Sequence, residues 1–104
     1  MRYQFIYNDR LGIRLPELHH SWEEYSADEQ SHILLEWEEI RSAIPDRIIQ
    51  LEEQINRKQA QLSDEDDFPT ACQLVNDIHD LASIINDLNI WFRIQQDVET
   101  KIHA

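Results

Sequence analysis

The stretch SDEDDFP, residues 63–69, separates two long segments that both have helical periodicity. Pro69 fits the first turn of a helix, where the missing N–H has no intrahelical partner in any case. Asp67 or Phe68 precedes it in the position of a helix cap. We therefore predict that the chain turns here and that a new helix begins at about residue 68.

The two predicted helices, 27–63 and 68–101, have similar lengths. At 1.5 Å per residue each spans roughly 50 Å. Two helices of equal length joined by a short connection pack as an antiparallel pair. The expected fold is therefore all-α, dominated by a long antiparallel helical hairpin.

The first long helix, 27–63, begins with a clear signal and continues past a proline. Ser26 and Glu29 form a capping box. Its apolar residues fall within one narrow arc at 100° per residue: Ile33, Trp37, Ile40, Ile44, Ile48, Leu51, Ile55 and Leu62. The arc keeps its phase across Pro45, so we interpret Pro45 as a kink in a nearly continuous helix.

The second long helix, 68–101, changes its apolar face near its end. Up to residue 88 the apolar side chains share one face, but Ile90, Trp91 and Ile94 point to nearly the opposite side. Ordinary helical drift of about 20° per heptad does not explain this change. We expect this end to be covered on two sides, by N-terminal elements or a second subunit. Two helices bury little area alone, so we expect a homodimer that forms a four-helix bundle.

The N-terminal quarter has a different pattern. The strand-like runs 3–7 and 13–15 flank the turn sequence DRLG, which predicts a β-hairpin over residues 1–15. Residues 16–25 predict a short helix with Pro16 in its first turn. A two-stranded hairpin is marginal alone. We expect both elements to fold against the open end of the helical hairpin, giving a single domain over residues 1–104.

Net charge excludes several classes of partner. The chain carries −12, and the charge is uneven. Residues 1–14 hold three Arg against one Asp, a local balance of +2, so the remaining ninety residues carry −14. Such a surface repels phosphate groups, so we expect no direct nucleic-acid or membrane role. The single Cys72 needs no oxidising compartment, and no apolar signal core begins the chain, which favours the cytoplasm.

A polar insertion interrupts the last helix at Asn86, Asp87 and Asn89. Buried Asn side chains fix the register between helices. Pro45 cannot donate to the carbonyl of Arg41, and either Asn could donate to it across the hairpin. These five residues form a predicted structural polar cluster.

Two other hypotheses concern this region: an ion pair to Asp87, and a binding notch between two tryptophans. Arg41 or Arg47 would pair with Asp87. Alternatively, the polar residues form a notch between Trp37 and Trp91 that recognises a ligand or a peptide.

The function that we favour is non-catalytic: a small acidic protein–protein interaction or regulatory protein acting as a homodimer, with an unidentified protein partner. Trp and Arg side chains dominate binding hot spots. The predicted contact residues at the open end are Trp22, Trp37, Trp91 and Arg93, beside the basic Arg2, Arg10 and Arg14. No Gly-rich phosphate loop, Ser-His-Asp spacing or zinc-ligand set occurs in the sequence, so we expect no cofactor.

Two alternatives remain open. Glu36-x-x-Glu39 and Asp77-x-x-Asp80 resemble the acidic pairs of all-α nucleotide pyrophosphohydrolases, and the resemblance, confined to two tetrapeptides, implies a site for Mg²⁺. The other alternative is an acidic mimic of nucleic acid that binds a basic protein.

Overall fold

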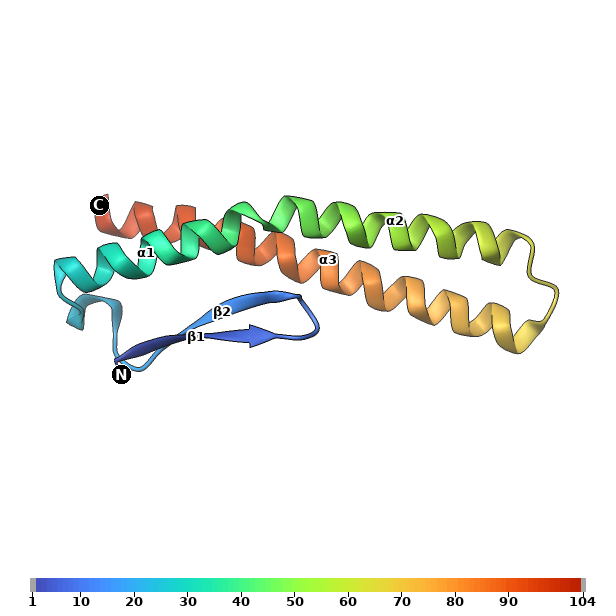
Figure 1. The fold of residues 1–104 in the computed structure, drawn as a ribbon, viewed down its shortest axis with the longest axis horizontal. Helices are drawn as coiled ribbons and strands as arrows, with labels where there is room; N and C mark the ends of the chain where they lie inside the picture. The colour runs from blue at the N-terminus through green and yellow to red at the C-terminus, as the bar shows by residue number, and fades with distance from the viewer. Residues whose placement is uncertain (1, 104) are drawn as a thin grey trace.

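The computed structural model describes residues 2–103, with side chains described for residues 2–94. Figure 1 shows a mostly helical chain with one small N-terminal β-hairpin. In chain order the elements are β1 (Tyr3–Asn8), β2 (Ile13–Leu18), the 3₁₀ turn η1 (Trp22–Glu24), α1 (Ala27–Ser42), α2 (Ile44–Ser63) and α3 (Phe68–His103). None of the described helices combines the length and the apolar character needed to cross a membrane.

The helices α2 and α3 run antiparallel and are joined by the short connection at residues 64–67, as predicted (Figure 1). Asp67 is the capping residue of α3. Its carboxylate accepts hydrogen bonds from the Thr70 backbone N–H at 3.1 Å and from the Thr70 hydroxyl at 2.6 Å. Pro69 lies in the first turn, where it costs no hydrogen bond. The predicted turn and helix start are therefore confirmed.

The predicted long helix 27–63 is present as two helices that bend at Ala43 (Figure 1). The Ala43 N–H donates to the carbonyl of Ile40 at 3.1 Å, a tighter turn than the α-helical pattern. Pro45 follows in the first turn of α2, where it has no N–H to donate to the preceding turn. Ile40 and Ile44 are both buried, so the apolar face continues through the bend. The predicted capping box of Ser26 and Glu29 is present as well.

The predicted turn of the β-hairpin is confirmed at residues 9–12. Asn8 closes it: its side-chain oxygen accepts from the Leu11 N–H at 2.9 Å, and its carbonyl accepts from the Gly12 N–H at 2.8 Å. Gly12 has a φ of +76°, which other residues rarely adopt. A Cβ at this position would lie 2.7 Å from Nε of Arg47, which donates to the Leu11 carbonyl. Glycine is required here for its conformation, and a larger residue would also displace the Arg47 side chain from its place beside the turn.

The predicted short helix over residues 16–25 is wrong. Strand β2 continues through Pro16 to Leu18, and η1 is a single turn. The His19 N–H donates to the Arg2 carbonyl at 3.3 Å, which makes these two residues a hydrogen-bonded pair. Such pairs alternate along an antiparallel ladder, so Pro16, opposite Phe5, occupies a non-hydrogen-bonded position. Its missing N–H therefore costs no bond in the ladder.

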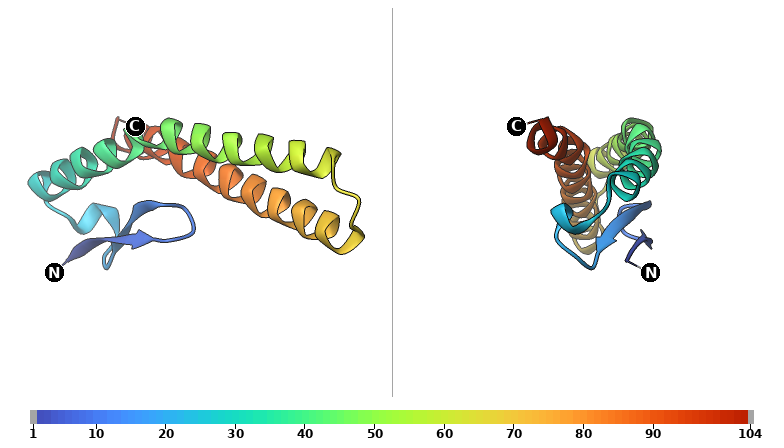
Figure 2. Two further views of the ribbon diagram at one scale, coloured as in Figure 1. Left: turned by 45° about the vertical axis from the view of Figure 1, so that its right-hand side comes forward. Right: turned by 90° about the vertical axis from the view of Figure 1, so that its left-hand side faces the viewer.

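The main core lies at the bend, where the tip of the β-hairpin meets all three helices. Its buried members are Leu11, Ile13, Trp37, Ile40, Ile44, Leu51 and Leu88. Figures 1 and 2 show the hairpin lying along α1 and the middle of α3. The described N-terminal elements thus cover one side of α3 and leave Ile90 exposed.

Candidate interaction surface

The polar insertion of α3 lies on the surface. Asn86, Asn89 and Arg93 are exposed, and Phe92 is half-buried beside them. Among the described residues these four line a hollow of about 380 Å³. Spacings of three and four residues place Asn86, Asn89 and Arg93 on one side of the helix. This surface, which we define as the α3 patch together with the exposed Ile90, offers amide groups, a cation and apolar atoms side by side.

The tryptophans predicted to form a contact region have three different environments. Trp37 is buried in the core, and its ring meets that of the half-buried Trp91 edge-on, with centroids 5.8 Å apart. This pair confirms the predicted register of the helical hairpin. Trp22 packs against Tyr25 instead, with ring centroids 6.3 Å apart. Trp37 therefore serves packing, and a contact surface near it has to use exposed neighbours on α3.

The prediction that Asn86 or Asn89 compensates for Pro45 is wrong. Both side chains are exposed, and in the described part of the chain neither bonds to the carbonyl of Arg41. The Arg41 side chain reaches α3 instead. Its Nε donates to the Phe92 carbonyl at 2.7 Å, and its guanidinium lies 4.2 Å from the centre of the Phe92 ring. The contact between Arg41 and Phe92 was not predicted, because the sequence around Phe92 indicated only that its side chain lies on an apolar helix face.

Asp87 belongs to a different contact from the one predicted. It pairs with Arg10 at 2.6 Å, and Arg10 also donates to the Ser83 hydroxyl at 2.9 Å. Arg41 and Arg47, the predicted partners, both donate to backbone carbonyls. Arg10 lies at the tip of the β-hairpin, and its place on α3 depends on how the hairpin docks, which no local pattern specifies.

The basic N-terminal segment is held to the acidic helices by ion pairs. Besides the Arg10–Asp87 contact, Arg2 pairs with Glu29 and Arg14 with Glu36, each at 2.9 Å. Exposed pairs of this kind contribute at most about 1 kcal/mol each. The uneven charge of the sequence therefore serves contacts within the chain, because these ion pairs link the β-hairpin segment to α1 and α3.

The acidic pairs considered for a metal site are far apart. Glu36 is next to Trp37 on α1, and Asp77 lies fourteen residues before Trp91 on α3, roughly 20 Å along the helix. Glu36 is paired with Arg14, while Asp77 accepts from Lys58 at 3.2 Å and from Gln73 at 2.8 Å. Glu39 and Asp80 are exposed. Within the described residues, no group of three or more His, Cys, Asp or Glu side chains is arranged to hold a metal ion.

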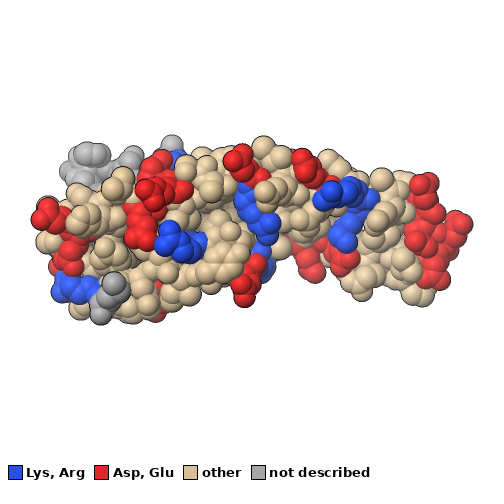
Figure 3. All heavy atoms as spheres, in the orientation of Figure 1, with Lys and Arg blue, Asp and Glu red and all other residues tan. Residues whose placement is uncertain are grey.

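Charged side chains are unevenly spread over the face in Figure 3. Acidic groups gather at the end where α2 and α3 join, the location of Asp64, Glu65, Asp66 and Asp67. Lys and Arg side chains alternate with acidic ones along the middle of the molecule. Acidic groups also lie toward the opposite end, where Lys and Arg side chains stand near them, so the turn is the part of this face where acidic groups are least mixed with basic ones.

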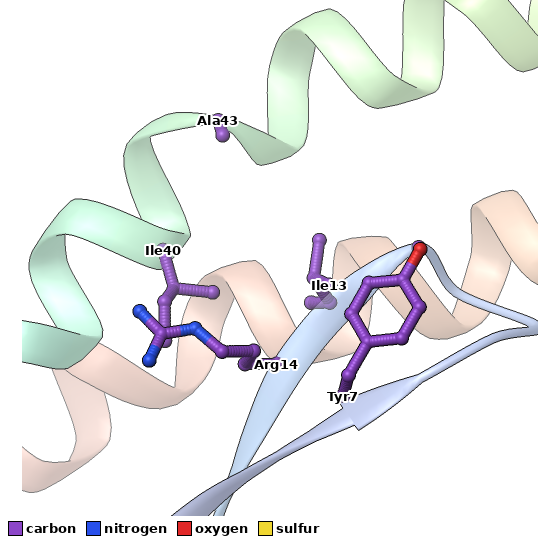
Figure 4. Close-up of a pocket in the computed structure, with 6 residues that line it drawn as sticks. Tyr7, Ile13, Arg14, Ile40 and Ala43 are labelled. Carbon is purple, nitrogen blue, oxygen red and sulfur yellow. The ribbon is translucent and has the colours of Figure 1, made fainter.

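A second hollow, of about 300 Å³, lies where the β-hairpin meets the bend between α1 and α2. Figure 4 shows Tyr7 extending from β1 toward this bend and Arg14 reaching from β2 toward α1. Ile13, Ile40 and Ala43 contribute to its lining. The hollow marks the boundary between the hairpin and the bent helix, with Tyr7 at its outer edge.

Stability is expected to fall in acid through three carboxyl groups whose pKa lies below its ordinary value. The Ser26 backbone N–H lowers the pKa of Glu29, the Thr70 hydroxyl lowers that of Asp67, and the Gln73 amide, with Lys58, lowers that of Asp77. A depressed folded-state pKa adds stability above the unfolded-state pKa, and this is lost as pH falls through the folded value.

Urea unfolding between about pH 6 and pH 3 tests this dependence, since unfolded carboxyl groups titrate near pH 4. Asp67→Asn is the matched variant, because Asn also caps helices but does not titrate. We expect the variant to lose less stability on acidification than the natural chain. Equal losses in the two proteins would contradict the role assigned to Asp67.

Comparison with protein-family models, curated proteins and solved structures finds no match for this chain. Its candidate function therefore rests on the geometry of its own residues.

Proposed function

We propose that this chain is a non-catalytic protein–protein interaction or regulatory protein, that it acts in the cytoplasm as a homodimer, and that a protein partner binds the α3 patch. The observation that carries the proposal is the exposure of Asn86, Asn89 and Arg93 around one hollow on α3, with the exposed Ile90 next to them on the helix. The helix fixes the backbone positions of these residues before a partner binds, so only their side chains have to be ordered on binding.

The chemistry of the α3 patch suits a polypeptide partner. The two Asn side chains both donate and accept hydrogen bonds, and therefore match backbone groups of either kind. Ile90 supplies apolar area, with 47% of its surface exposed. Arg93 can bind a carboxylate through two parallel hydrogen bonds. A mixed apolar and polar surface with an arginine is typical of binding hot spots.

The proposed dimer forms through the N-terminal part of α3. Phe68, Cys72 and Val75 are exposed, and their spacing places them on one side of the helix. Packing this stripe against that of a second copy would place two helical hairpins together as a four-helix bundle. The stripe and the α3 patch lie at different levels of α3, so dimerisation leaves the patch accessible.

Capture of partners by the tagged chain, with washes at low and high salt, tests the binding proposal. We expect a partner that survives the high-salt wash, because apolar contacts are not screened. Ile90→Asp is expected to abolish its capture. The control is Ile49→Asp, the same substitution at an exposed position on α2.

The two variants separate the possible outcomes. A partner lost with Ile90→Asp but kept with Ile49→Asp supports the α3 patch. A partner that both variants retain and that high salt releases favours the acidic mimic, with binding at the acidic end near Asp66. No specific partner in either wash would overturn the proposal and make thermal stabilisation by Mg²⁺ the next measurement.

A further inference from the structure

The outer edge of β1 carries backbone groups that the hairpin leaves unpaired. Hydrogen-bonded pairs occur at every second residue along an antiparallel ladder, and Arg2 with His19 is one such pair. The backbone N–H and C=O groups of Gln4, Ile6 and Asn8 therefore point toward β2. The same groups of Tyr3, Phe5 and Tyr7 therefore point away from β2. Among the described residues, no backbone or side-chain hydrogen bond reaches them.

This edge faces outward. In Figures 1 and 2, β2 lies between β1 and the helices. Tyr7 is 59% exposed, and Ile6 is also exposed. Proteins usually protect such edges with charged residues, prolines or bulges. Residues 3–8 contain no charged residue and no proline, and they pair with β2 in continuous register. The edge is thus open to another strand.

We propose that β1 pairs with β1 of a second copy of this chain, antiparallel and centred on Phe5, so that two hairpins form one four-stranded sheet. A two-fold symmetric contact requires a self-complementary surface. The segment YQFIY meets this requirement, because reversal about Phe5 places Tyr3 opposite Tyr7. Phe5 lies opposite itself, and aromatic pairs directly opposite each other stabilise a sheet.

The charge distribution favours a second copy as the occupant of this edge. Two chains of net charge −12 repel one another over most of their surfaces, but the strand from residue 3 to residue 8 is uncharged. Its ends carry opposite charges, Arg2 before the strand and Asp9 after it. Antiparallel pairing places Arg2 of one copy opposite Asn8 and near Asp9 of the other, so no like charges meet at either end, although Arg2 also pairs with Glu29 of its own chain.

This inference goes beyond the proposed function, because it concerns β1 and not the helices. The β1 contact and the helical-stripe contact are two different two-fold contacts on the same chain. If both form, each copy binds two different neighbours, so the assembly contains more than two copies. The two contacts can therefore be removed one at a time.

The experiment compares Tyr7→Pro with Tyr7→Val by sedimentation equilibrium over a range of concentrations. Proline removes the outward N–H at a position where β2 needs none, whereas valine removes the same ring and keeps the N–H. Circular dichroism and urea unfolding confirm that each variant folds. We expect Tyr7→Pro to weaken association through β1 by at least roughly tenfold relative to Tyr7→Val, because each copy loses one intermolecular hydrogen bond.

Amide hydrogen exchange gives an independent measurement on the natural chain. At low concentration the amides of Tyr3, Phe5 and Tyr7 should exchange quickly, while those of Gln4 and Ile6 are protected by β2. At high concentration the first three should also become protected. Unchanged exchange, or equal association of Tyr7→Pro and Tyr7→Val, would overturn the pairing of β1.

A third variant, Val75→Asp, keeps this test separate from the proposed bundle. Loss of association with Tyr7→Pro alone supports the β1 contact and contradicts the bundle. Loss with Val75→Asp alone supports the bundle and overturns the β1 contact. If Tyr7→Pro and Val75→Asp each reduce the size of the assembly but neither alone gives a monomer, both contacts are supported.

Discussion

Replacing Leu88 by alanine is expected to lower the free energy of unfolding by about 2–5 kcal/mol. Leu88 has 0% of its surface exposed and belongs to the core at the bend, together with Ile44 and Leu51. The substitution removes apolar contacts and leaves a cavity lined by α2 and α3, which long rigid helices cannot easily close. For a small domain this is a large share of a total stability of about 5–15 kcal/mol.

Leu35→Ala is the control, because it deletes the same atoms from an exposed position. Leu35 is 64% exposed on α1. A surface substitution of this kind changes stability by no more than about 0.5 kcal/mol. Urea unfolding of both variants gives the comparison. Similar losses for the two would mean that Leu35 is covered, most simply by a second subunit, and would contradict the assignment of Leu88 as the more deeply buried leucine.

The features predicted correctly are those that depend on residues close together in the chain. The apolar arc through Trp37, the capping box at Ser26 and the turn before Pro69 each need only a few neighbouring residues to be recognised. Helical periodicity extends this local information over a whole element. The pairing of Trp37 with Trp91 then follows from helix length and loop length alone.

The features that were missed depend on where the β-hairpin docks. Arg10 reaches Asp87 across more than seventy residues of sequence, and Arg14 reaches Glu36. Their positions follow from Leu11 and Ile13 entering the core at the bend, which no periodic pattern indicates. The exposure of Asn86 and Asn89 has the same origin, since the hairpin and α2 cover the other sides of α3 and leave this one open.

Pro16 shows how one residue can support two local interpretations. Proline is common in the first turn of a helix, and also on the outer side of an edge strand. The sequence after it contains apolar residues at helical spacing, which favoured a helix over residues 16–25. The structure has a strand here instead, because Leu18 pairs with Tyr3 and β2 continues to that point.

Tyr25→Phe is expected to lower the free energy of unfolding by about 1–3 kcal/mol, because it removes three part-buried hydrogen bonds to backbone groups at once. The His20 N–H loses the partner it has in the described structure, whereas the His19 N–H and the Arg2 carbonyl keep the bond between them. Tyr25 is 4% exposed. Its hydroxyl donates to the Arg2 carbonyl at 2.7 Å and accepts from the N–H groups of His19 and His20 at 3.1 and 3.2 Å. One hydroxyl thus uses its full capacity, one donor and two acceptor positions, to close the open end of the β-hairpin.

Tyr7→Phe removes the same hydroxyl from an exposed ring and serves as the control. Urea unfolding at a protein concentration below that of self-association compares the two variants. Amide exchange at His20 adds a local measurement, since its N–H bonds to the Tyr25 hydroxyl and should exchange faster in Tyr25→Phe only. The His19 N–H keeps the Arg2 carbonyl as an acceptor and should change less. If Tyr25→Phe and Tyr7→Phe are equally stable, the hydroxyl of Tyr25 does not hold the hairpin ends together. The anchoring of β1 would then rest on Leu11, Ile13 and the arginine ion pairs.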